Sequence, residues 1–361
     1  MKRFNKGRMV TRSIKLSDVA KAAGVSLGTA SNVFNRPALV RAEVREQVEA
    51  AALALGYSGP DPVGRLLMGG KANAIGVLPA GDMSVSFALS SPYLRAMLLG
   101  IAEICDENGA SLVIVSGSRD RKEWAIRNAL VDGFVLGNVD EIEMVRARHR
   151  RVPFVLMDME GGSDVNSVCI DGYDGARQQA EHLLALGHRR FAIFAVQRHP
   201  ANAVFHAPGR RGTELQGGYP LDLQKLRGYA DTLAAAGISI HDVPMVEGFP
   251  PSPYAEAGAR LLLDRAPEAT AVLCMADKNA IAMLGEATSR GIRVPEALSI
   301  IGFDDVEDAA GTTPPLTTIA QRTDEKGRVA ARMLFAGGPP RQEVMKVELV
   351  ERKSTAPVRQ S

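Results

Sequence analysis

The chain has 361 residues, of which 46% are hydrophobic and 23% charged, and this composition suits an ordinary globular protein of two or three domains. No apolar stretch approaches the roughly 18–20 residues of a membrane span, and the basic N-terminus lacks the apolar core of a signal peptide. The three widely separated cysteines argue against a disulfide framework, so we expect a cytoplasmic protein.

The charge is unevenly distributed along the chain. Residues 1–71 carry a net charge of +7 and the remaining residues a net charge of −5, which together give the formal +2 of the whole chain. A small basic part on a mildly acidic remainder is typical of a protein that binds a polyanion at one end. The alternative is a basic part that is only solvated.

Small residues dominate the segment at 16–37, LSDVAKAAGVSLGTASNVFNRP. Small side chains let helices approach closely, and the apolar spacing predicts two short helices. The first is expected over 18–23 with Ser17 as its N-cap, and the second from its cap Ser26 to about Phe34. The pattern predicts a tight helix-turn-helix, which presents one helix to something outside the protein.

A third helix is predicted over 42–55, where Gly56 would end it. The Pro- and Gly-rich residues that follow have the composition of a linker. The predicted organisation is a basic extension at 1–13, a DNA-binding headpiece at 14–58, a hinge at 59–72 and a body at 73–361.

The body alternates continuous apolar runs with helical patterns, which predicts parallel sheets covered by helices on both faces. The runs are AIGVLP (74–79), LVIVSG (112–117), GFVLG (133–137), PFVLMD (153–158), FAIFAV (191–196), AVLCMA (271–276) and SIIGFD (299–304). Ligands of such sheets bind beyond the carboxyl ends of the strands. Those ends carry Asp158, Asp277, Asp304 and Asp305.

Several motifs in this order and spacing resemble the lactose-, galactose- and purine-repressor family of bacterial transcription regulators. They are the helix-turn-helix segment, RLLMGG (65–70), VDGFVL (131–136), ALGHRRFAIF (185–194), VPEALSIIGFDD (294–305), PPLTTIAQ (314–321) and LVERKST (349–355). The resemblance implies an α/β chain with an all-α headpiece and a two-lobed body like periplasmic binding proteins. It places lobe 1 at about 73–170 and 322–350, and lobe 2 at about 171–321 and 351–361.

The resemblance also implies the partners. Members of the family are homodimers or larger assemblies that bind palindromic operator DNA, and a small effector between the lobes controls them. We therefore expect a transcription regulator that acts as a repressor, without cofactor, metal or enzymatic activity.

The family's DNA-contacting positions fall at the start of the first helix, on the second helix with its cap, and in the hinge. They correspond here to Ser17, Ser26, Leu27, Gly28, Thr29, Ser31, Asn32 and Leu67. Leu27 can make only apolar contact, Gly28 offers no side-chain hydrogen bond, and Asn32 can pair with adenine. The resemblance makes Leu67 a wedge for the minor groove.

The family's effector positions correspond to Tyr93, Asp158, Lys225, Phe249, Asp277, Asp304 and Gln321. Lys225 stands where the family commonly has Arg, so bidentate binding of an acid is less expected. Two acceptor carboxylates, Asp158 and Asp304, against one ammonium favour a sugar or polyol first and a sugar acid or phosphate second. Phe249 would be a stacking platform or a core residue, and strand-end aspartates also serve as helix caps.

Two other function classes remain open at this stage. A sugar-processing enzyme with an accessory headpiece would need a phosphate loop or a catalytic constellation, and GVSLG (24–28) matches the esterase G-x-S-x-G pattern without the preceding strand. A sugar-binding protein carrying the same headpiece is the other alternative. The basic loop at 197–220 is longer than is usual in the family, and the sequence does not explain it.

Overall fold

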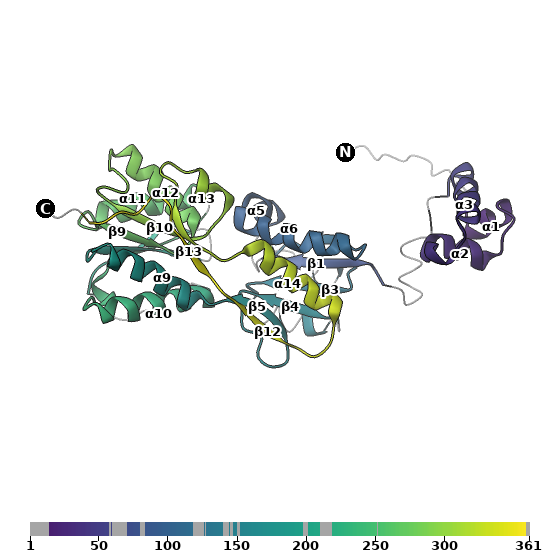
Figure 1. Cartoon of the computed structure of the whole chain (residues 1–361), viewed down its shortest axis with the longest axis horizontal. Helices are drawn as coiled ribbons and strands as arrows, with labels where there is room; N and C mark the ends of the chain where they lie inside the picture. Colours follow the sequence, from purple (N-terminus) through teal and green to yellow (C-terminus); the bar gives the residue numbers. More distant parts are fainter. Residues whose placement is uncertain are drawn as a thin grey trace, which may run out of the picture. The chain divides into compact units, whose positions relative to one another are not determined.

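The computed structural model describes residues 14–57, 59, 71–79, 84–117, 126, 128–139, 144, 147–149, 152–197, 201–209, 219–250 and 252–358 (Figure 1). The chain divides into two compact units, Met1–Ala72 and Asn73–Ser361, and each is taken by itself below. The predicted extension at 1–13, most of the hinge with Leu67, and parts of the loop at 197–220 lie outside the described residues.

The described residues of the first unit form three helices and a short 3-10 turn. They are α1 (Leu16–Ala22), α2 (Leu27–Asn35), η1 (Pro37–Leu39) and α3 (Ala42–Leu55). The second and third helices begin and end close to the predicted residues, and Gly56 ends α3 with φ 69°. Gly24 turns the chain between α1 and α2 with φ 61°, a conformation that glycine adopts without steric cost.

The prediction that Ser17 caps α1 was wrong. Lys15 occupies the N-cap position, and its backbone N–H donates to the Asp18 carboxylate over 2.9 Å. The helix therefore begins at Leu16, and Ser17 is an exposed residue of its first turn. Asp18 favours this start because a carboxylate near a helix N-terminus accepts an N–H that has no partner inside the helix.

The headpiece core is built from small apolar side chains. Val19, Ala20, Ala30, Val33 and Val48 are buried at the junction of the three helices. Their size explains why three short helices can pack closely enough to exclude water from so few side chains.

The second unit has two sheets, which confirms the predicted α/β class with mostly parallel strands. The first sheet has the order β12 (Gln342–Met345), β5 (Asn166–Ile170), β4 (Phe154–Met157), β3 (Gly133–Gly137), β1 (Ala74–Leu78), β2 (Ser111–Ile114). The second has the order β13 (Glu348–Val350), β11 (Thr317–Ala320), β10 (Ser299–Asp304), β9 (Ala271–Cys274), β6 (Phe191–Val196), β8 (Met245–Gly248), β7 (Val204–His206). All seven predicted apolar runs contain strands of these sheets.

The boundary of lobe 1 differs from the expected residue 350. Strand β13 pairs antiparallel with β11, with Leu349 opposite Ile319, and so belongs to the sheet of lobe 2. Strand β12 pairs with β5 of lobe 1. The chain therefore returns to lobe 2 between Met345 and Glu348. The two consecutive short strands extend different sheets, β12 the edge strand β5 of lobe 1 and β13 the edge strand β11 of lobe 2.

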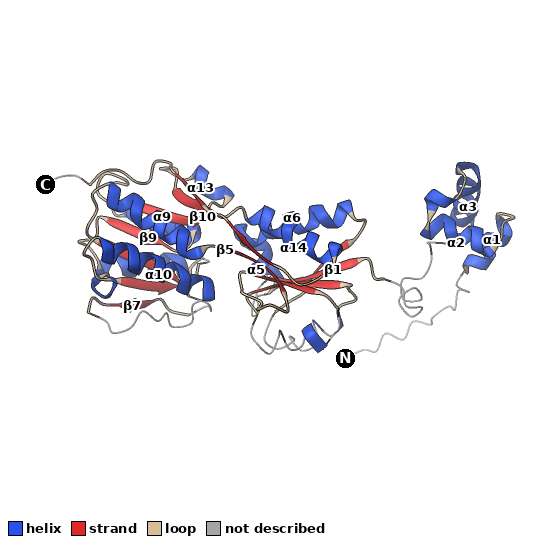
Figure 2. Ribbon diagram, turned by 60° about the horizontal axis from the view of Figure 1, so that its bottom comes forward, coloured by secondary structure: helices blue, strands red, loops and turns tan. Residues whose placement is uncertain are grey.

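Helices cover both faces of the lobe 2 sheet (Figures 1 and 2). On one face lie α9 (Gly172–Ala185) and α10 (Pro220–Ala235), and on the other α11 (Tyr254–Arg265) and α12 (Asp277–Ser289). In lobe 1, α6 (Pro92–Glu107) and α14 (Thr323–Ala336) pack side by side on the sheet, preceded by the short α5 (Val85–Ser90). Short helices η2 (Ile240–Asp242) and α13 (Glu307–Gly311) complete lobe 2. Among the described helices, none combines the length and the apolar character of a membrane span.

The contact between α6 and α14 depends on glycine, which gives a first testable prediction. A Cβ at Gly100 would lie 1.9 Å from the carbonyl oxygen of Asp324. Gly100→Ala should therefore lower the free energy of unfolding by about 1–3 kcal/mol, since the two helices must separate. The matched control is Gly285→Ala on α12, where a Cβ meets nothing within 4 Å and helix propensity alone should stabilise the chain slightly. Equal effects of the two substitutions in urea unfolding would contradict the prediction.

Candidate functional site

The N-terminus of α2 is held by a side-chain cap. The Thr29 backbone N–H donates to Ser26 Oγ over 3.0 Å, and the two hydroxyls lie 2.8 Å apart. This confirms Ser26 as the N-cap. Both hydroxyls thus take part in closing the first turn of the helix, and the cap sets the direction in which α2 leaves the turn.

One face of α2 is exposed and the other packs on the headpiece core. Leu27, with 55% of its surface accessible, Gly28 and Asn32 are exposed, whereas Ala30 and Val33 are buried. An exposed leucine next to a glycine leaves an open, apolar surface at the helix N-terminus. Thr29 and Ser31 are partly buried at its edges. The structure therefore brings all the predicted helix positions to one end and face of α2, while Ser17 lies on α1.

The predicted wedge residue Leu67 lies outside the described residues. Its role in the minor groove stays a prediction.

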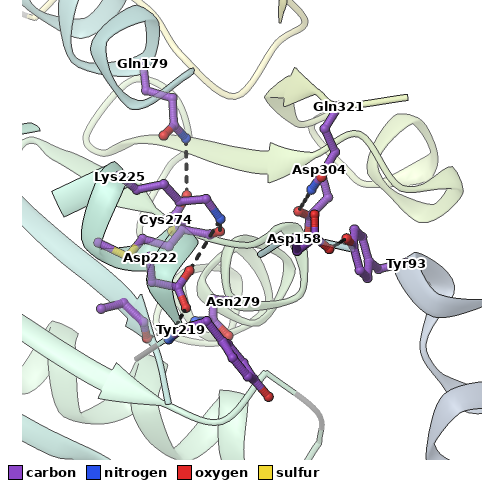
Figure 3. A network of polar contacts seen from close by, with 12 residues as sticks. Tyr93, Asp158, Gln179, Tyr219, Asp222, Lys225, Cys274, Asn279, Asp304 and Gln321 are labelled. Carbon is purple, nitrogen blue, oxygen red and sulfur yellow. Dashed lines mark hydrogen bonds and ion pairs between the residues drawn. The ribbon is translucent and has the colours of Figure 1, made fainter. Parts of the chain in front are cut away.

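A cleft of about 650 Å³ lies between the two lobes of the second unit, and residues of both lobes line it. Six of the seven predicted effector residues are among them: Tyr93, Asp158, Lys225, Phe249, Asp304 and Gln321. Asp158 follows β4 and Asp304 ends β10, so the cleft opens at the carboxyl ends of strands, as expected for this architecture. Figure 3 shows Asp158 joined to Tyr93 and Asp304 joined to Gln321.

Both of these aspartates have unusual backbone conformations. Asp158 has φ 59° and Asp304 has φ 127°, in the region that residues with a side chain rarely adopt. Aspartate tolerates positive φ better than most residues. Such conformations are typical of binding sites, where the chain is held to aim a side chain.

A lysine that the sequence analysis did not identify lies behind the lobe 1 side of the cleft. Lys326 Nζ is fully buried and donates to Asp158 Oδ1 over 2.6 Å, to Tyr93 Oη over 2.7 Å and to Gln321 Oε1 over 2.7 Å. The Tyr93 hydroxyl in turn donates to Asp158 Oδ2. Burial and the Asp158 charge raise the pKa of Tyr93 well above its usual value, so its proton stays in this contact.

Lys225 is also engaged within the protein. Its Nζ donates to the Met275 carbonyl oxygen over 2.8 Å, lies 3.5 Å from Asp222 Oδ1, and sits 4.1 Å from the centre of the Phe303 ring. Asp222 lines the cleft as well and was not predicted. Burial raises the pKa of Asp222, and the Lys225 charge opposes that rise. Figure 3 shows the contact between the Lys225 and Asp222 side chains.

The pKa of the Asp304 carboxyl group is raised far enough to change its charge near neutral pH. Burial raises its pKa to about 8, against the opposing charge of Lys225, so the group holds a proton near neutral pH. Its Oδ1 accepts from Gln321 Nε2 over 2.6 Å. This part of the cleft thus contains two ion pairs, Lys326 with Asp158 and Lys225 with Asp222, and one carboxyl group that is largely neutral. Glu256, Arg260, Lys278 and Glu286 also line the cleft.

The prediction that Asp277 contacts the effector was wrong, because its side chain does not line the cleft. It is fully buried in lobe 2, where Oδ1 accepts from the Thr318 hydroxyl over 2.5 Å and Oδ2 from the Val306 N–H over 2.9 Å. Both oxygens join α12 to the loop after β10 and to β11. Burial raises its pKa to about 6.

Phe249 faces another aromatic ring. It stacks on Phe87 of α5 with ring centres 5.6 Å apart and meets Tyr254 edge-on at 5.7 Å. Only 4% of Phe249 is exposed, yet it lines the cleft together with Phe87. An apolar side chain from each lobe therefore meets at this end of the cleft, and the predicted stacking of Phe249 on an effector stays a prediction.

Three residues that line the cleft carry a side-chain oxygen that accepts no hydrogen bond from the described residues. They are Asn138 with Oδ1, Gln197 with Oε1 and Glu256 with Oε2. Each of these oxygens is buried at the atom, so none of them is open to the cleft in this structure. In the described part of the chain, no cluster of His, Cys, Asp and Glu could hold a metal ion.

Comparisons with known proteins agree with these features. A family profile described as bacterial regulatory proteins of the lacI family matches residues 15–59, and one described as a periplasmic binding protein-like domain matches residues 180–355. A curated HTH-type transcriptional regulator of Mycobacterium tuberculosis is 33% identical over 361 residues, which cover 96% of this chain and 98% of that protein.

Solved structures also resemble this chain over nearly its whole length. The lac repressor dimer bound to operator and the anti-inducer ONPF is 28% identical, with a TM-score of 0.74 and coverage of 96% of this chain and 100% of that one. The complex of the transcriptional regulator CelR with cellobiose is 27% identical, with a TM-score of 0.66 and coverage of 94% and 99%. The chain therefore belongs to the lacI family of bacterial regulatory proteins and is a DNA-binding transcription regulator rather than an enzyme.

Proposed function

We propose that this regulator is a dimer that binds a palindromic operator through α2. An uncharged, hydroxyl-rich effector that enters the cleft either lowers or raises the affinity of the dimer for the operator. The observation that carries the effector part is the cleft itself: two lobes meet around aromatic side chains, the paired carboxylates Asp158 and Asp222, and the protonated Asp304. The solved lac repressor that resembles this chain is a dimer on its operator. Such a protein works where the DNA is, at the nucleoid in the cytoplasm.

Exposed apolar side chains support the dimer. Leu89 and Leu99, at 48% and 58% exposed, border a groove of about 730 Å³ that runs along α6 past Leu112 of β2. Apolar grooves of this kind are typical of surfaces that another protein covers. A two-fold dimer would present two copies of α2 to the two halves of a palindrome.

The operator contact is tested with Asn32→Ala. Operator DNA is first selected from a random-sequence pool with the unaltered protein, and binding is then measured against that DNA and its single-base variants. Asn32→Ala should relax the preference at one position of each half-site, because an amide pairs bidentately with adenine and discriminates by about 1–3 kcal/mol. The control Gln47→Ala removes a side chain that donates to the Ala23 carbonyl from α3, and it should leave base preference unchanged. If Asn32→Ala weakened all sequences equally, Asn32 would contact phosphate and not a base.

The effector class is tested by a thermal-shift screen of the full chain. Ribose, glucose, inositol and cellobiose form the uncharged panel, and glucuronate and glucose 6-phosphate the acidic one. We expect stabilisation by an uncharged compound, because the ammonium groups of Lys225, Lys278 and Lys326 are already paired within the protein. Stabilisation by the acidic panel alone would contradict the proposal. Release or tightening of selected operator DNA by the same compound then shows that it is the regulatory signal.

A further inference from the structure

The side chain of Lys326 is surrounded by acceptors that reach the effector cleft. Its ammonium has three N–H donors, and Asp158, Tyr93 and Gln321 accept one each at 2.6–2.7 Å. All three acceptors line the cleft, whereas Lys326 itself is fully buried behind them. The buried charge is thus paired and fully hydrogen-bonded, which is the arrangement that makes such a burial tolerable.

The lysine also dictates which way its neighbours point. Because an ammonium can only donate, the Gln321 oxygen must face Lys326, and the Gln321 amide nitrogen must then face Asp304, to which it donates over 2.6 Å. For the same reason Tyr93 accepts from Lys326 and uses its own proton toward Asp158. One buried cation therefore sets the donor and acceptor directions at the lobe 1 side of the cleft.

The contacts continue from one lobe to the other. Asp158 belongs to lobe 1, Lys326 lies on the first turn of α14, Gln321 follows the end of β11, and Asp304 ends β10 of lobe 2. The path from Asp158 through Lys326 and Gln321 to Asp304 crosses the region where the chain passes between the lobes. A movement of the lobes that separates Asp158 from Asp304 must stretch or break it.

We infer that Lys326 is a positioning residue of the effector site, which holds Asp158 as a fixed anionic acceptor and orients Gln321 toward Asp304 of the opposite lobe. The inference rests on the proposed binding of an uncharged effector in this cleft. Without Lys326, Asp158 would be an unpaired buried carboxylate, which takes up a proton or moves toward water. In either case the effector loses the Asp158 carboxylate as a fixed acceptor.

The test compares four chains: the unaltered protein, Lys326→Met, Asp158→Asn and the double variant. Urea unfolding between pH 5.5 and 8 gives the first readout. Lys326→Met should raise the unfolding equilibrium constant at pH 8 by at least about a hundredfold, and by less at pH 5.5, where Asp158 can be protonated. The double variant should recover most of this loss, because neither a cation nor an anion is left unpaired.

The other titratable groups near this pair are common to all four chains. They are Tyr93 on α6, Cys169 on β5, Asp222 on α10 and Asp304 on β10. A pH effect that vanishes in the Asp158→Asn background therefore belongs to Asp158. Arg148→Met is the matched control, since it removes one partner of the exposed pair with Asp164 and should leave unfolding nearly unchanged.

The second readout is the thermal shift given by ribose, glucose, inositol and cellobiose. We expect the shift to be lost in Lys326→Met and to stay lost in the double variant, although the latter should regain most of the stability of the unaltered chain. A double variant that regains the sugar response, or a stability loss in Lys326→Met that ignores pH and Asp158, would overturn the inference and leave Lys326 a packing residue. If the unaltered chain responds to no uncharged sugar, the proposed effector class fails, and the unfolding measurements still decide the pairing of Lys326 with Asp158.

Discussion

Asp304→Asn should make the protein more stable than the unaltered chain at neutral and alkaline pH. Burial raises the pKa of Asp304 to about 8, whereas in the unfolded chain the group ionises near its ordinary value of 3.8. Between these two pH values the folded state holds a proton that the unfolded state has lost, so stability falls as pH rises through this window. Asparagine resembles the protonated acid, tolerates positive φ and still accepts from Gln321.

The size of this effect follows from the shift. One unit of difference between the pKa values of the folded and unfolded states corresponds to about 1.4 kcal/mol. Because the Asp304 side chain is partly exposed, screening by solvent reduces the total for the whole difference. We expect a gain of about 2 kcal/mol or more at pH 8, which declines to nothing near pH 4. Urea unfolding of both chains at four or five pH values measures it.

The neighbouring aspartate supplies a control of opposite sign. Asp305 Oδ1 accepts from Arg352 over 2.6 Å, so Asp305→Asn breaks an ion pair and should destabilise the chain at pH 7. Parallel pH profiles of Asp304→Asn and the unaltered protein would show that Asp304 is ionised in the folded state.

Substitution of Asp304 should also weaken effector binding in the cleft. Asp304→Ala removes both carboxyl oxygens from the cleft, and the loss of a hydrogen-bonding partner costs a bound ligand about 1–3 kcal/mol. We therefore expect binding of the responding sugar to weaken by about ten- to a hundredfold. A buried acid that destabilises the fold while serving a ligand is a usual feature of binding sites.

The headpiece could be predicted in detail because its determinants are local. The bounds of α2 and α3 follow from Ser26, Pro37 and Gly56, which act within one helical turn of their own positions. The start of α1 was misplaced by two residues since a lysine, whose side chain makes no cap, occupies the N-cap position. The hydrogen bond from the Lys15 N–H to the Asp18 carboxylate favours Lys15 over Ser17 as the N-cap residue of α1.

The strands that were not predicted are those without a continuous apolar run. NSVCI and TTIA, which form β5 and β11, contain polar residues that are nonetheless buried, such as Ser167, Thr317 and Thr318. The two threonine side chains have distant partners: Thr317 Oγ1 accepts from the Arg352 N–H over 3.0 Å, and the Thr318 hydroxyl donates to Asp277. Such partners are known only when the chain is folded.

Within the site, Lys326 likewise could not be identified from the sequence. It stands in the run TDEKGR, which has the composition of a solvated helix face, and only the packing of α14 against α6 buries it. Gly327 next to it allows that packing, since a Cβ there would lie 2.3 Å from the Met97 carbonyl oxygen. The predicted charges of the cleft therefore included neither Lys326 nor Asp222. The preference for an uncharged effector is unaffected, because Lys326 pairs with Asp158 and Asp222 with Lys225.

Asp277→Ala should destabilise lobe 2 strongly and leave effector binding intact in molecules that remain folded. The substitution deprives the buried Val306 N–H and the Thr318 hydroxyl of their acceptor. Each unsatisfied buried donor costs about 1–3 kcal/mol, so we expect a loss of about 3 kcal/mol or more in the free energy of unfolding. Urea unfolding measures this loss, and calorimetry with the responding sugar at low temperature measures binding.

The structural role of Asp277 can be separated from a role in binding by its partner on β11. In a Thr318→Val background one of the two donors is already gone, so Asp277→Ala should cost less there than in the unaltered chain. Asp158 provides the contrast, because it also follows a strand but lines the cleft, and Asp158→Asn should weaken sugar binding. A variant Asp277→Ala that keeps its stability and loses sugar binding would place this carboxylate in the cleft after all. The two aspartates are alike in sequence context, and both oxygens of each have partners within the protein. What distinguishes them is that Asp158 lines the cleft and Asp277 does not.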